Sequence, residues 1–177
     1  MRISYGCVGL ITAVIIAVAP ANAALPTPPQ AAATQQAQAF LFYGGAGDVF
    51  EITTSMIALQ HSQNPQVRAF ASMLIGDHTN LTNSNLATAK AAGVVPPPPE
   101  LSPMQKGMIT QLIAAGPANV DRVYLSQQIP AHQMALQMMQ GYASSGDVPQ
   151  LRQAATAAIP VVQGHLAQAQ QLLGSLR

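Results

Sequence analysis

Breaks made of proline and glycine divide most of this chain into long segments that have the period of an α-helix. The breaks lie at residues 64–65, 93–99, 116–117 and 146–149. Between them, apolar and small residues recur every three or four positions, which is the spacing of one helix face. No segment has the alternation with a period of two that is typical of a half-buried strand. We therefore expect helices over residues 34–62, 65–92, 102–115, 117–144 and 147–173.

Four of these helices are long, and the short one lies in the connection between the second and the third long helix. This order predicts an all-α domain over residues 34–174, a ferritin-like four-helix bundle with one long crossover that carries the short extra helix. Asn64 and Asp147 are the expected N-caps of the two helices that follow short turns. Pro130 and Pro160 lie inside expected helices and should kink them.

The N-terminus has the organisation of a secretory signal peptide. A positive start, Met1-Arg2, precedes an apolar run over residues 7–18 that is too short for a final membrane anchor. The small residues of Ala21-Asn22-Ala23 then fit a cleavage site. We predict a signal peptide over residues 1–23, cleaved after Ala23, and a Pro/Ala-rich linker over residues 24–33. The expected location is periplasmic or secreted, and an uncleaved anchor is the alternative.

Charge and cysteine content exclude several classes of function. Only 7% of the residues are charged, against ~25% in a typical soluble domain. The net charge of +1 gives no electrostatic basis for nucleic-acid binding or for a polybasic membrane patch. No second segment is apolar enough for a transmembrane helix in the mature chain. Cys7 is the single cysteine, so neither an internal disulfide nor a thiolate metal site is expected.

Four residues with acid or imidazole side chains lie near the middles of the four long helices. They are Glu51, His78, His132 and His165, and each lies on or beside an apolar stripe. Because a helix rises ~1.5 Å per residue, small offsets from the helix centres amount to only several ångströms. In an up-and-down bundle the helix centres share one level, so we expect these four groups to converge in the core.

Three neutral imidazoles and one carboxylate can hold a single transition metal, with zinc, copper and iron as candidates. Asp77 is a candidate outer partner that would orient His78, and facing solvent is its alternative. A di-iron carboxylate centre needs more carboxylates and Glu-x-x-His repeats, whereas Glu51 is followed three residues later by Thr54. The alternative to a metal is a metal-free buried cluster that only fixes the packing of the helices. No catalytic residue or organic cofactor site is indicated.

The remaining histidine and the methionines have simpler interpretations. His61 lies at the end of the first expected helix and is interpreted as a surface residue. Methionine thioethers suit Cu(I), but Met is also a common filler of irregular core gaps. Met134, Met138 and Met139 only partly resemble a tight copper-binding cluster. Core filling is therefore the preferred interpretation of the methionines.

Several motifs resemble those of one bacterial family. They are Phe50-Glu-Ile52, the segment 67–79 with its Asp-His-Thr, the segment 124–132 ending at His132, and the segment 159–166 around His165. Over about residues 40–173 the chain resembles the ferritin-like domain-of-unknown-function family 4142. The resemblance implies a ferritin-like helical fold and export, and it implies no established activity. Gly44, Gly45 and Gly47 depart from the Ala-rich sequence expected there.

Three functions are consistent with these patterns. The preferred hypothesis is an exported ferritin-like protein of envelope maintenance or stress, with a central metal-binding or degenerate metal site. The second is a non-catalytic structural or interaction module. The third is a redox or peroxide-handling metalloenzyme, which would need an open coordination position. The sequence indicates no substrate and no oligomeric state.

Overall fold

The computed structural model describes residues 35–176, all helices and their connections. The signal peptide and linker predicted for residues 1–33 lie outside this range. The helices are α1 (Gln35–His61), α2 (Pro65–Ala91), α3 (Pro103–Ala114), α4 (Gly116–Ser145) and α5 (Pro149–Ser175). No strand occurs among the described residues. The prediction of an all-α protein is therefore confirmed.

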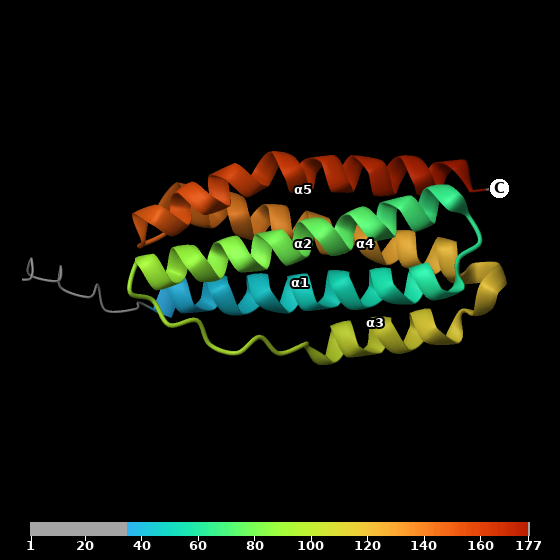
Figure 1. Ribbon diagram of the computed structural model, residues 1–177, viewed down its shortest axis with the longest axis horizontal. Coiled ribbons are helices and arrows are strands. Elements are labelled where there is room, and N and C mark those ends of the chain that lie inside the picture. Colours follow the sequence, from blue (N-terminus) through green and yellow to red (C-terminus); the bar gives the residue numbers. More distant parts are fainter. Residues whose placement is uncertain (1–34, 177) are drawn as a thin grey trace, which may run out of the picture.

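The four long helices pack side by side around a common axis. α1 contacts α2, α2 contacts α5, α5 contacts α4, and α4 contacts α1, so that the contacts close a ring. Successive long helices run in opposite directions within the pairs α1–α2 and α4–α5 (Figure 1). Residues 92–102 return along the outside of the ring, and α3 lies against α1 and α4. Short α3 thus covers one side of the ring.

Local sequence signals explain most of the helix ends. The Asn64 side chain accepts hydrogen bonds from the backbone N–H groups of the first turn of α2, as predicted for an N-cap. Ser102 forms a capping box with Gln105 at the start of α3. The prediction of Asp147 as an N-cap was wrong: Val148 occupies that position without a side-chain cap. The Asp147 carboxylate is already used, because it accepts a 2.8 Å hydrogen bond from the Tyr142 hydroxyl.

The apolar core consists of two clusters, one toward each end of the ring of helices. All four long helices contribute to a layer of buried polar side chains, and this layer separates the two clusters. One cluster includes Phe40, Ala89, Tyr142, Leu151 and Val162. The other includes Ala58, Phe70, Leu74, Tyr124 and Ala169. The polar layer between them contains Asp48, Glu51, Thr54, Ser55, His78, Gln128, His132 and His165.

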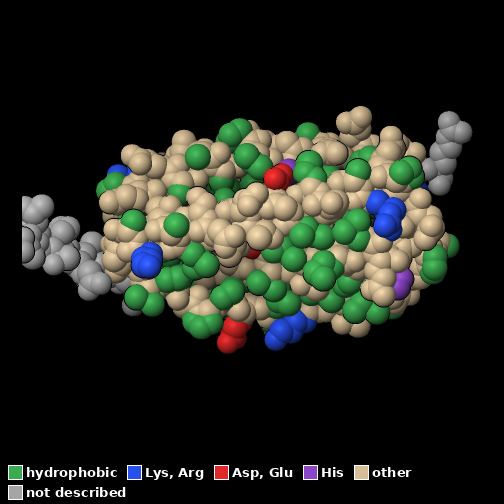
Figure 2. Space-filling model, in the orientation of Figure 1, with side chains coloured by type: hydrophobic (Ala, Val, Ile, Leu, Met, Phe, Trp, Pro, Cys, Tyr) green, Lys and Arg blue, Asp and Glu red, His purple; other side chains and the backbone are tan. Residues whose placement is uncertain are grey.

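The exterior carries few charged side chains on the face shown in Figure 2. Hydrophobic side chains gather there over α3 and the neighbouring part of α1. Tyr43, Met104 and Ile113 are among the exposed large hydrophobic residues. Even so, no helix within residues 35–176 combines the length and the hydrophobicity that crossing a bilayer requires.

Candidate metal centre

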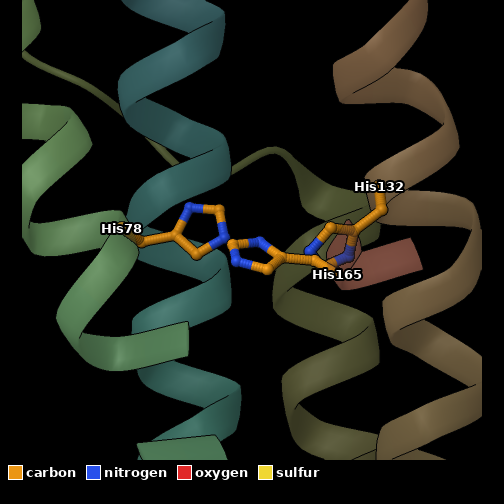
Figure 3. A group of neighbouring side chains, drawn as sticks. All are labelled: His78, His132 and His165. Atoms are coloured by element: carbon orange, nitrogen blue, oxygen red, sulfur yellow. The ribbon is translucent and has the colours of Figure 1, made fainter. Parts of the chain in front are cut away.

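Three histidine rings from three helices meet in the polar layer. His78 comes from α2, His132 from α4 and His165 from α5. Their ring centroids lie 5.4 to 5.8 Å apart, and the rings point toward one another (Figure 3). One ring nitrogen from each histidine lies within 4.8 Å of those of the other two. All three residues are buried, at 5% exposure or less.

One nitrogen of each histidine ring makes a hydrogen bond. His78 Nδ1 lies 2.8 Å from Asp48 Oδ1, and His165 Nε2 lies 2.9 Å from Asp77 Oδ2. His132 Nδ1 lies 2.8 Å from the backbone carbonyl of Gln128. Since a carbonyl or carboxylate oxygen accepts, these nitrogens donate, and the neutral ring keeps its lone pair on the opposite nitrogen. Metal-binding histidines are oriented in the same way.

The opposite nitrogens have no protein partner. His78 Nε2, His132 Nε2 and His165 Nδ1 are buried and make no hydrogen bond with any described residue. A buried polar atom without a partner costs about 1–3 kcal/mol, so three of them in one place require a compensating interaction. Three neighbouring imidazole lone pairs are a donor set for zinc, copper or iron.

Glu51 reaches the same layer from α1. Its Oε1 lies 3.5 Å from His132 Nδ1, and its Oε2 is buried without a hydrogen-bond partner. Burial, the largest effect, and the charge of Asp48 together raise the pKa of the Glu51 carboxyl to about 8, against the opposite effects of His78 and Gln128. A cation beside this carboxyl would favour its ionised form.

The three rings differ in their affinity for a proton. Burial, the largest effect, and the neighbouring His78 and His165 together lower the pKa of His132 to about 3, against the effect of the Gln128 carbonyl. Burial also lowers the pKa of His165, against its hydrogen bond to Asp77. Burial acts on the pKa of His78 in the same direction, but the hydrogen bond to Asp48 and the charges of Glu51, Asp48 and Asp77 outweigh it and raise that pKa. A metal therefore competes with a proton mainly at His78.

Asp48 and Asp77 orient two of the histidines, and neither contact was predicted from the sequence. Asp77 contacts His165 rather than His78, its neighbour in the chain. Successive residues on a helix do not face each other, so Asp77 points toward α5. Asp48, which the sequence analysis missed, accepts hydrogen bonds from His78 and, at 2.6 Å, from the Thr82 hydroxyl. The spacing of three residues between Asp48 and Glu51 was the one available signal, since it places both acids on one face of α1.

The structure thus brings together the three histidines named from the sequence and places Glu51 beside them. Glu51, His78, His132 and His165 are all buried, as expected from their positions on the apolar stripes. The three histidines by themselves form the group that can hold a metal ion, without Glu51. Binding of a metal, and a role for Glu51 as a ligand, stay predictions.

Two clefts reach the histidines from opposite sides. The larger has a volume of about 680 Å³, lies between α1, α3 and α4, and has Asp48, Glu51, His78 and His132 in its lining. The smaller has a volume of about 300 Å³ and lies between α2 and α5. His165 and Asp77 belong to its lining. The centre is therefore enclosed by helices yet adjoins space on both sides.

The interpretation of the methionines as core filling was wrong for several of them. Met56, Met104 and Met134 are 59%, 57% and 51% exposed. Met139 is buried and does belong to the core. Met104 and Met134 line the larger cleft, together with three further methionines.

Comparison with known proteins places the chain in a family. The sequence profile of the domain of unknown function DUF4142 matches residues 22–172, and the chain belongs to this family. No curated protein matches it.

Two solved structures have a similar fold. The "DUF305 fragment from Deinococcus radiodurans" has a TM-score of 0.72 at 20% identity, over 81% of this chain and 99% of that one. The structure of "CopM in the Cu(I)-bound form" has a TM-score of 0.65 at 23% identity, over 76% of this chain and 93% of that one. At these identities the likeness concerns the fold.

Proposed function

We propose that this chain is an exported helical protein that binds a single transition-metal ion at His78, His132 and His165, with Glu51 as the fourth ligand. One observation carries the proposal. Each of the three neighbouring rings has one buried nitrogen without a partner, while its other nitrogen is held by an oxygen. An ion there would accept three lone pairs that nothing else in the described chain satisfies.

Copper belongs in the first test beside zinc and iron. CopM is described in its Cu(I)-bound form and has a similar fold, although its copper says nothing about the ligands of this chain. Imidazole nitrogen suits all three metals. The metal is therefore to be identified by measurement and not by the donor set.

The wider arrangement of the helices supports a ferritin-like bundle. The α1–α2 and α4–α5 pairs, joined by a long crossover that carries α3, follow the connectivity of that class. Residues 1–23 would direct the chain to the periplasm or outside the cell, where an envelope or stress role fits a metal-binding protein. Mass spectrometry of the exported protein should find Ala24 at its N-terminus. Retention of residues 1–23 would contradict cleavage.

Metal analysis tests the proposed centre. Protein purified without chelator should carry about one equivalent of metal, and the stripped protein should regain one equivalent of zinc or copper. Binding that is tight enough for the metal to be present at 100 times its Kd should raise the free energy of unfolding by ~2.7 kcal/mol. The His132→Ala/His165→Ala double variant should lose the ion.

A matched control is available at the fourth histidine. His61 ends α1 and lies outside the histidine group, so His61→Ala should bind metal like the unaltered protein. Circular dichroism of the double variant checks that its helices persist. Equal metal content in the double variant and in the unaltered protein would refute the site.

A second candidate function rests on the hydrogen bonds that join the helices. Asp48 links α1 to His78 on α2, Asp77 links α2 to His165 on α5, and Glu51 approaches His132 on α4. Such contacts fix the register of the helices without any ion, as in a structural or interaction module. A metal-free protein that stays folded and gains no stability from zinc, copper or iron would favour this function.

A further inference from the structure

Five methionines line the larger cleft, and four of them form two pairs on two helices. Met104 and Met108 lie four residues apart on α3, and Met134 and Met138 lie four residues apart on α4. Residues at this spacing share one face of a helix. Because α3 packs against α4 and all four residues line one cleft, the two methionine pairs border the same space.

The two methionines of each pair differ in exposure. Met104 and Met134 are more than half exposed. Met108 and Met138 are half-buried, and His132 at the inner side of the cleft is only 1% exposed. An exposed methionine contributes little to a core, so core packing does not explain the outer pair.

The acidic side chains of the cleft favour a cation. Three acids line it among the described residues, Asp48, Glu51 and Glu100, and no Lys or Arg does. The rest of the lining is mostly apolar, so a hard, strongly hydrated cation has few oxygen ligands to replace its water. Thioether sulfur prefers soft ions, of which Cu(I) is the biological example.

We propose that this cleft binds a soft monovalent cation, Cu(I), through the thioethers of Met104, Met108, Met134 and Met138. The site is separate from the histidine centre and does not depend on a metal there. His78 and His132 line the same cleft, so the thioether site and the histidine centre adjoin one space.

Removing the histidine ligands isolates the thioether site. Under anaerobic conditions, the His132→Ala/His165→Ala variant should still take up Cu(I) from a competing chelator. Ag(I), a redox-inert analogue, should bind likewise. Adding Met104→Leu and Met134→Leu to this variant should weaken Cu(I) binding about tenfold or more, because Leu keeps the size and removes the sulfur. Unchanged Cu(I) affinity after the methionine substitutions would overturn the proposal.

The control is a methionine of equal exposure outside the cleft. Met56→Leu, on α1, should leave Cu(I) affinity unchanged, since Met56 is 59% exposed and does not line the cleft. An equal loss in Met56→Leu would overturn the proposal, as would complete loss of Cu(I) binding in the histidine variant itself.

Zinc binding tests the histidine centre independently of the thioether site. Thioethers are poor ligands for Zn²⁺, so Met104→Leu/Met134→Leu in the otherwise unaltered protein should bind zinc normally. Absence of zinc, copper and iron at the histidines would refute the proposed function without touching the thioether site.

Discussion

The carboxylate of Asp77 holds the ring of His165, 88 residues further along the chain. Asp77 Oδ2 lies 2.9 Å from His165 Nε2, and the bond joins α2 to α5. The side chain of Asp77 is 41% exposed, whereas that of His165 is 5% exposed. The bond therefore connects the buried centre to the smaller cleft, which both residues line.

Replacing Asp77 by Asn should weaken metal binding without unfolding the protein. The amide keeps the size of the carboxylate but removes its charge, so His165 becomes a poorer electron donor and its orientation is less fixed. Loss of such an outer partner typically costs 10- to 100-fold in metal affinity. Competition titration of the stripped Asp77→Asn variant with zinc should show a reduction of that order. An exposed site tolerates the change, so the free energy of unfolding without metal should alter by less than about 1 kcal/mol.

A control for this substitution lies at the turn between α4 and α5. Asp147 accepts a hydrogen bond from Tyr142 and is no partner of the histidines. Asp147→Asn should leave zinc affinity unchanged. If Asp77→Asn and Asp147→Asn bind zinc equally well, the contact between Asp77 and His165 does not tune the site.

The ionisation of Glu51 should make the metal-free protein less stable as the pH rises. Its pKa is about 8 in the folded protein and 4.5 in the reference state. Between these values the unfolded chain releases a proton that the folded chain retains, so the contribution of Glu51 to stability is greatest below pH 4.5 and falls up to pH 8. Glu51→Gln cannot ionise and should be more stable than the unaltered protein at pH 8, by on the order of 2 kcal/mol.

Urea unfolding with a metal chelator, at pH 5 and at pH 8, measures this difference. The gain from Glu51→Gln should be confined to the higher pH. A gain of the same size at both values would mean that ionisation is not its cause.

His132 and His165 should produce the opposite dependence in acid. Burial lowers the pKa of His132 from 6.5 to about 3. Below pH 6.5 the unfolded chain takes up a proton that the folded chain does not, so stability is lost as the pH falls toward 3. The pKa of His165 is lowered too and acts in the same direction.

His132→Gln should reduce the loss of unfolding free energy in acid. The reduction corresponds to at most one proton, or ~1.4 kcal/mol per pH unit. The measurement is the free energy of unfolding of metal-free protein between pH 6 and pH 4. Identical pH slopes for His132→Gln and the unaltered protein would show that His132 is protonated in the folded state.

The level of the polar layer could be predicted from sequence because helix ends fix helix centres. Asn64 and Pro65 place the start of α2, and His78 then falls at its middle on a buried stripe. The same reasoning applies to His132 in α4 and His165 in α5. The helical period and the residues that end a helix are properties of short segments, so they can be read from the sequence.

The partners of the histidines could not be predicted in the same way, because they depend on the rotation of one helix against another. Asp48 lies in a stretch of α1 with three glycines nearby, and its burial follows from the approach of His78 and Thr82 on α2. The cleft that exposes Met104 depends likewise on how far α3 stands from α4. Such distances arise from packing between helices and leave no period in the sequence.

The turn between α4 and α5 should be sensitive to one methyl group. A Cβ at Gly146 would lie 2.5 Å from the Tyr142 carbonyl oxygen and 2.6 Å from an atom of its ring. Tyr142 cannot move freely, because its ring stacks on Phe40 at 4.2 Å and its hydroxyl donates to Asp147. Gly146→Ala should therefore destabilise the protein by about 1–3 kcal/mol, as overpacking does.

Gly141 provides the comparison that separates a clash from a general effect of alanine. It lies five residues earlier in the interior of α4, and nothing lies within 4 Å of the Cβ that it lacks. Since Ala favours a helix over Gly, Gly141→Ala should stabilise the protein by about 0.5–1 kcal/mol. Urea unfolding of both variants should give changes of opposite sign, with zinc affinity unaffected because neither glycine belongs to the histidine centre. If both substitutions stabilise, Tyr142 has room to move, and the contacts of its ring with Phe40 do not fix the turn.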